Sequence, residues 1–191
     1  MNHRGFSLVE MTVAVAVVLV MAAVAGPAFR ARFADAHLVG AGRQFKSHFR
    51  LAWSTAVRSG VYTAIRFERH EDGRVFYALY ADGNYNGVRS ADIVSGEDRL
   101  VAGPVPLSGG APGVRVGINA GVPTLPPERG LLSGDPVRFG PSDILSFSPF
   151  GTATPGTFYL AGDSAQAAVR VTGGSARVRL MLWRGGRWRE R

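Results

Sequence analysis

The chain opens with a long uncharged apolar run, continues in a helical pattern and then changes to a period of two. Residues 11–29 carry no charged side chain. At about 1.5 Å of rise per residue, a helix of this length crosses a bilayer core of roughly 30 Å. Apolar residues then recur every three or four positions up to Ser59-Gly60, which predicts an amphipathic helix with one buried face. The residues of that face are Leu38, Ala41, Phe45, Phe49, Ala52, Trp53 and Ala56.

Beyond Gly60, apolar and polar residues alternate, which is typical of β-strands. Residues 61–68 and 75–81 lie on either side of Asp72-Gly73 and predict a β-hairpin. Further strands are expected at 99–105, 114–118, 144–147, 157–161, 168–171 and 177–183. The predicted fold class is therefore α+β: a long N-terminal helix, half transmembrane and half amphipathic, packed on an antiparallel β-sheet domain.

Glu10 is a lone acid at the start of the apolar segment. An intramembrane carboxylate costs about 2.5–3.5 kcal/mol near the bilayer centre and less near an interface, so we expect Glu10 to have a partner. The order Gly5-Phe6-Ser7-Leu8-Val9-Glu10, after a short basic leader and before an apolar helix, resembles the type III signal of type IV pilins and type II secretion pseudopilins.

The resemblance implies a defined processing step and a defined contact. A prepilin peptidase in the membrane cuts after Gly5 and methylates the new amino terminus at Phe6. Residues four apart share a helix face about 6 Å along the axis, so Glu10 can receive the Phe6 ammonium of a neighbouring subunit shifted by one turn. The lone acid then sets the register of assembly.

Pro27 lies at the joint between the two halves of the predicted helix. Proline removes one backbone hydrogen bond, so we expect a kink there. In the resembled family a proline near this place accompanies helix melting in filaments. The alternative for the whole N-terminal region is an ordinary secretory signal, cut after Ala23-Val24-Ala25, that releases a free periplasmic domain.

The C-terminal half also resembles a pilin family. Residues 144–151, 157–160 and 177–180 look like the globular part of GspH/FimT-like minor pilins. The expected organisation is a prepilin leader at 1–5, a transmembrane and assembly helix at 6–29, an amphipathic helix at 30–59 and a β-rich GspH/FimT-like domain at 60–191.

The implied function is structural. The chain is expected to be a minor pilin or pseudopilin of a type II secretion or type IV pilus machine, held in the inner membrane by one helix, with its globular domain in the periplasm. Its partners would be other pilin subunits and the prepilin peptidase. No cofactor is expected, and because the chain has no cysteine, thiol redox chemistry is excluded.

The basic C-terminus favours an alternative function, capture of DNA for uptake. The formal net charge is +8, and residues 170–191 hold seven arginines against one acid. In FimT-like members a Gly-Arg-x-Arg motif contributes to DNA binding; Arg177 and Arg179 match its arginines, and Ala176 stands at the glycine position. Further arginines alternate with Trp183 and Trp188, a composition able to clamp phosphates and stack on bases. These further arginines are Arg184, Arg187 and Arg189.

The arginines have a simpler interpretation as well. Alternate positive charges on the solvent face of an edge strand discourage sheet-to-sheet aggregation. The sequence leaves this interpretation open beside DNA binding.

A short polar loop and the four histidines are the candidates for metal binding and catalysis. Asp82, Asn84 and Asn86 place oxygen atoms at alternate positions before Gly87, as at the start of a calcium loop. Ile93 stands where that loop has a bidentate acid, and Asn-Gly and Asp-Gly pairs also form ordinary turns. The four histidines show no metal-ligand spacing, and no nucleophile-elbow motif occurs, so no enzyme activity is predicted.

Overall fold

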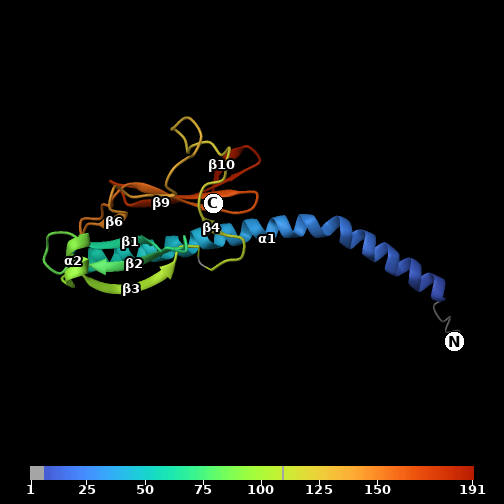
Figure 1. Cartoon of the computed structure of the whole chain (residues 1–191), viewed down its shortest axis with the longest axis horizontal. Coiled ribbons are helices and arrows are strands. Elements are labelled where there is room, and N and C mark those ends of the chain that lie inside the picture. The colour runs from blue at the N-terminus through green and yellow to red at the C-terminus, as the bar shows by residue number, and fades with distance from the viewer. Residues whose placement is uncertain (1–6, 109) are drawn as a thin grey trace.

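The computed structural model describes residues 7–108 and 110–191, and it describes their side chains apart from those of residues 26–32. The predicted cleavage site, Gly5 and Phe6, therefore lies outside the described residues. Within the described part, one long helix carries two antiparallel sheets on its C-terminal half, while its N-terminal half projects away from them (Figure 1).

Helix α1 runs from Leu8 to Ser59. Its N-cap is Ser7, whose side-chain oxygen accepts a hydrogen bond from the amide of Val9. It ends at Gly60, which has a φ of 70° and donates its N–H to the carbonyl of Ala56. Glycine adopts this left-handed conformation without strain, so the sequence stops the helix where the period changes.

Two antiparallel sheets follow the helix. The first has the strand order β3-β2-β1-β6 and the second the order β10-β9-β8-β7-β4, with β5 paired to β7. The first sheet is formed by β1 (Thr63–Arg69), β2 (Val75–Ala81), β3 (Arg99–Pro106) and β6 (Ile144–Phe147). The second is formed by β4 (Arg115–Val116), β5 (Val137–Arg138), β7 (Gly156–Ala161), β8 (Gln166–Thr172), β9 (Arg177–Arg184) and β10 (Arg187–Glu190). A short helix, α2 (Ser90–Ser95), joins β2 to β3.

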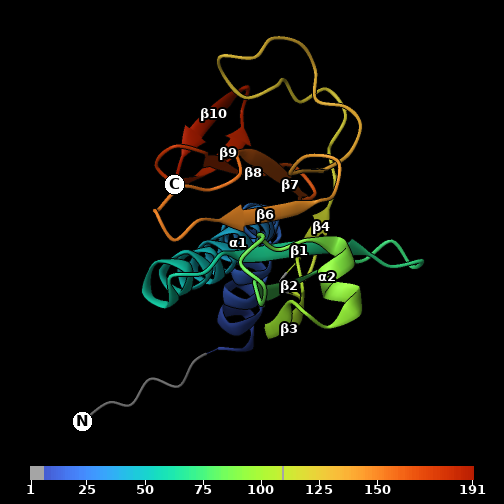
Figure 2. The same ribbon diagram turned by 90° about the vertical axis from the view of Figure 1, so that its left-hand side faces the viewer.

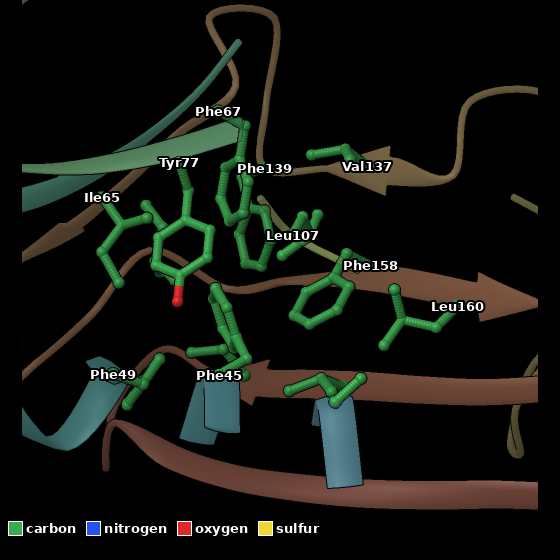
Figure 3. Close-up of a cluster of buried hydrophobic side chains, with 14 of the residues drawn as sticks. Phe45, Phe49, Ile65, Phe67, Tyr77, Leu107, Val137, Phe139, Phe158 and Leu160 are labelled. Carbon is green, nitrogen blue, oxygen red and sulfur yellow. The ribbon is translucent and has the colours of Figure 1, made fainter. Parts of the chain in front are cut away.

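The core lies where α1 meets both sheets (Figure 2). The ring of Phe45 packs edge-on against Tyr77 of the first sheet, at 5.3 Å between centroids, and against Phe158 of the second, at 4.4 Å. Figure 3 shows these side chains pointing into one cluster. The amphipathic half of α1 therefore holds the two sheets together, and aromatic contacts of this geometry add to the burial of apolar area.

The predicted buried face of α1 is confirmed at every position except Trp53. Leu38, Ala41, Phe45, Phe49, Ala52 and Ala56 are all buried. Trp53 is instead 39% exposed, and its indole N–H donates to the carbonyl of Gly151. Trp53 directly follows Ala52, so on a helix it lies about 100° round from the centre of the buried face, at the margin of the core.

The predicted antiparallel strands are present, with ends shifted by one or two residues. The 61–68 and 75–81 hairpin is β1 and β2, and the expected strand at 144–147 is β6. The run expected at 114–118 pairs over only two residues, as β4. Helix α2 and strands β5 and β10 were not predicted from the sequence.

Candidate functional site

The apolar half of α1 is uncovered. Its window from Leu8 to Ala25 has a mean hydropathy of 2.5, no part of it is buried, and it is long and apolar enough to cross a membrane. Apolar surface in water is unfavourable by about 25 cal/mol per Å², and a soluble domain rarely exposes a contiguous patch of this extent. This half of α1 therefore needs lipid or other apolar helices around it.

Glu10 lies on this uncovered half. It is exposed and sits in the first turn of α1, where the positive end of the helix dipole favours an acidic side chain. Thr12 beside it donates its hydroxyl to the carbonyl of Val9, within the helix. The carboxylate of Glu10 therefore faces outwards from the subunit, towards whatever surrounds the helix.

The helix is continuous at Pro27. The backbone of α1 is helical through this position, and α1 changes direction between the part packed on the sheets and the projecting part (Figure 1). The side chains of residues 26–32 lie outside those described, so a kink caused by Pro27 itself stays a prediction.

Strand β9 runs antiparallel to α1, which separates the predicted arginines. At one end of β9, Arg177 lines a groove together with Arg50 of α1. At the other end, Arg184 forms an ion pair with Asp35, which lies about four helical turns before Arg50 in α1. Between them, the strand passes so close to Gly42 that a Cβ there would lie 2.6 Å from Leu180 Cδ1.

The groove at the first end, which we call the distal groove, is a cavity of about 380 Å³. Its lining residues are Lys46, Phe49, Arg50, Trp53, Ser175, Ala176, Arg177, Val178 and Glu190. The lining contains three cations, Lys46, Arg50 and Arg177, and one acid, Glu190. A carboxylate oxygen of Glu190 lies 3.9 Å from a guanidinium nitrogen of Arg177. Lys46, Arg50 and Trp53 were not predicted as site residues, although their spacing of four and three places them on one helix face.

Ala176 keeps the backbone conformation of a glycine. Its φ is 44°, in the left-handed region that residues other than glycine seldom adopt. The β8–β9 turn therefore has a glycine-like geometry although the residue differs from the motif. Arg177 directly follows this turn and lines the distal groove. Arg179 lies opposite Arg170 of the neighbouring strand and is not among the residues that line the groove.

The arginines at the second end surround another cavity, of about 300 Å³, which we call the hairpin hollow. Its lining residues are Leu182, Arg184, Gly185, Arg187, Arg189 and Arg191. Arg187 lies opposite Arg184 across the β9–β10 hairpin, and Arg189 lies opposite Leu182. Since side chains alternate along a strand, these arginines share the sheet face of Leu182, which packs towards α1.

The tryptophans of the hairpin point to the other face. Trp183 and Trp188 lie opposite each other, with ring centroids 5.8 Å apart, and pack beside a second apolar cluster that contains Tyr159. The indole N–H of Trp188 donates to the carbonyl of Pro123 at 3.0 Å. Arg184, Arg187 and Arg189 therefore lie on the opposite sheet face from the tryptophans, whereas Arg179 shares the face of Trp183. The tryptophans themselves pack within the domain.

The calcium-like loop is held together by its own backbone. Asp82 is buried, and its two carboxylate oxygens accept the amides of Asn84 and Gly87 at 3.1 and 2.8 Å. Asp98, 2% exposed, accepts two more loop amides. Within residues 7–108 and 110–191, no group of three or more His, Cys, Asp or Glu side chains is placed to hold a metal ion. These oxygens act as turn-forming acceptors.

The long helix, half apolar and half packed in a small α+β domain, defines a membrane-anchored pilin-like subunit. A family model described as the prokaryotic N-terminal methylation motif matches residues 1–26. The model for the type II transport protein GspH matches residues 41–176, more than half of the chain, so the protein belongs to the GspH family of structural pseudopilins. No curated protein and no solved structure matches it.

Proposed function

We propose that the protein is a minor pseudopilin, cut by a prepilin peptidase after Gly5 and methylated at Phe6. The apolar half of α1 inserts into the inner membrane, the globular domain lies in the periplasm, and the same helix packs against other pilin subunits during assembly. The observation that carries the proposal is the uncovered apolar half of α1, continuous with a domain of the GspH family.

Intact-mass measurement of the membrane-bound protein tests the processing step. Coexpression with a prepilin peptidase should yield a chain that begins at Phe6 and carries one added methyl group. A chain that begins at Gly26 would instead show a secretory signal and would overturn the proposal. Without the peptidase the full mass should remain, which is the control.

Glu10 is assigned the register contact with the Phe6 ammonium of a neighbouring subunit. Glu10→Ala should leave membrane insertion and cleavage intact but reduce incorporation into filaments, because the ammonium loses its partner in a medium of low dielectric constant. Thr12→Ala, two positions away on the same exposed segment, is the matched control. Normal incorporation of Glu10→Ala would remove this role.

A second candidate function, DNA capture, is favoured by one observation: the distal groove gathers Lys46, Arg50 and Arg177 around the partly exposed Trp53. Cations that track phosphates beside an aromatic face are the usual composition of a nucleic-acid groove. Phe150, 88% exposed, lies on the turn whose Gly151 carbonyl accepts the indole N–H of Trp53. Five arginines were predicted for this function: Arg177, Arg179, Arg184, Arg187 and Arg189. The geometry favours only Arg177 among them, together with Lys46 and Arg50 of α1.

DNA affinity of the full chain in uncharged nanodiscs, measured across a salt series, tests this candidate. The triple variant Lys46→Ala, Arg50→Ala, Arg177→Ala should bind DNA more weakly. The logarithm of its binding constant should also fall less steeply with the logarithm of the salt concentration, by about 0.9 in slope for each lost phosphate contact. The charge-matched control replaces three exposed arginines outside the groove, Arg43, Arg58 and Arg99. Equal losses in both triple variants would show an effect of net charge alone.

A further inference from the structure

The hairpin hollow lies beside α1 close to the membrane-spanning segment. The uncharged stretch ends at Phe29, and α1 continues unbroken through Asp35, the partner of Arg184. Six residues of helix span about 9 Å, and the polar layer of a bilayer is about 5–7 Å thick on each side. The guanidinium of Arg184 therefore lies within about one Debye length of the headgroups.

The β9–β10 hairpin is directed towards this surface. Because β9 runs antiparallel to α1, its end at Arg184 and the Gly185-Gly186 turn lie at the end of the sheets from which the apolar half of α1 leaves (Figure 1). Membrane helices are tilted by about 20° on average, which can lower one side of the domain towards the bilayer. The ion pair to Asp35 fixes the hairpin against the helix, so the two move together.

The hollow carries uncompensated positive charge. Arg184 is paired with Asp35, whereas Arg187, Arg189 and Arg191 make no salt bridge within the described part of the chain. Glu190, between them in sequence, lies opposite Met181 on the other sheet face and near Arg177. Guanidinium groups bind phosphate oxygens in a planar, bidentate geometry.

We propose that the hairpin hollow binds the phosphate of an anionic phospholipid headgroup at the membrane surface from which α1 emerges. The proposal rests on the membrane insertion of α1 proposed above. A cavity of about 300 Å³ has room for one headgroup. A DNA duplex would have to approach between this face and the bilayer, whereas the distal groove lies further along α1 from the apolar segment. Basic pockets beside membrane helices are typical sites for anionic headgroups.

Hydrogen–deuterium exchange of the full chain in nanodiscs tests the proposal. Replacing part of the phosphatidylcholine by phosphatidylglycerol should slow amide exchange in residues 184–191 by about fivefold for each arginine that contacts a headgroup, and high salt should reverse this. Arg187→Ala with Arg189→Ala should remove most of the slowing, because two of the arginines that line the hollow are then lost. Arg187→Lys with Arg189→Lys keeps the charge and should retain part of it, which separates lost charge from a misfolded hairpin.

The controls distinguish the sources of phosphate and the underlying function. Arg58→Ala with Arg99→Ala removes the same charge elsewhere and should leave the slowing intact. Inorganic phosphate or short DNA added to phosphatidylcholine discs should have no comparable effect; equal protection by either would overturn the lipid assignment. Protein inserted in the disc with no response to phosphatidylglycerol overturns this inference alone, whereas protein that fails to insert contradicts the proposed function.

Discussion

Replacing Gln166 by leucine tests whether buried hydrogen bonds fix the second sheet. Gln166 lies in β8 and is 0% exposed. Its Nε2 donates to the carbonyls of Gly117 and Leu160, both at 2.9 Å, and its Oε1 accepts the amide of Asn119 at 2.8 Å. One side chain thus joins the segment after β4 to the β7–β8 pair.

The expected loss follows from these contacts. Leucine has a similar volume but no polar atom, so three main-chain groups lose a hydrogen-bond partner. Each buried group left unpaired costs about 1–3 kcal/mol, and burial of the leucine regains about 1.5–3 kcal/mol. We expect the free energy of unfolding to fall by about 3 kcal/mol net, which lowers the Tm by roughly 6–12 °C for a chain of this length.

Thermal unfolding of the full chain in detergent, followed by near-ultraviolet circular dichroism, measures this loss. Arg179→Gln, an exposed change on the neighbouring strand, should leave the Tm unchanged. Gln166→Glu keeps an acceptor for Asn119 but loses the donor when ionised, so it should be destabilised at neutral pH and partly recover in acid. An unchanged Tm in Gln166→Leu would refute the assignment of these bonds as determinants of the sheet.

Three further outcomes are expected. Gly83→Ala should destabilise the 82–98 loop by about 1–3 kcal/mol in chemical unfolding, because a Cβ would lie 2.0 Å from the carbonyl oxygen of Glu97. Burial raises the pKa of Tyr77 from 10.0 to about 12. The stability that its protonated hydroxyl contributes is therefore complete below about pH 10 and is lost as the pH rises through about 12. In Tyr77→Phe, the free energy of unfolding measured in urea should fall less steeply at alkaline pH. Ala176→Gly should leave DNA affinity within about twofold, because Ala176 already has a glycine-like φ; a tenfold gain in a filter-binding assay would contradict this.

Much of the fold is predictable because its signals are local. The change from a helical to a twofold period falls at Gly60, the residue that caps α1, and the hairpin strands follow their alternation. Strand β10 was not predicted because three of its four residues are charged, so it shows no alternation of apolar and polar residues. Its pairing with β9 depends on the turn that precedes it. That the strands form two sheets around one helix depends on contacts between residues far apart in sequence, which periodicity does not encode.

The candidate site was predicted less completely, for a geometric reason. Arginines from 177 to 189 form one group in the sequence, but seven residues of strand span about 23 Å, so β9 carries Arg177 and Arg184 to opposite ends of the domain. Lys46 and Arg50 precede Arg177 by more than a hundred residues in the chain yet line the same groove. Only the antiparallel packing of β9 on α1 reveals this combination.

The separation of the two basic sites has a consequence for any anion the protein meets. Arg177 and Arg184 are about 23 Å apart along β9, more than twice the Debye length of about 8 Å at physiological salt. The two sites nevertheless adjoin at β10, where Glu190 lines the distal groove and its neighbours Arg189 and Arg191 line the hairpin hollow. The effects of mutating Arg177 and Arg184 should therefore add, whereas mutations at Arg189, Glu190 or Arg191 should affect both sites. If both proposed anion sites are used, extraction from the bilayer would remove the headgroup but leave the distal groove unchanged, so the subunit would change its anionic partner as it moves from membrane to filament.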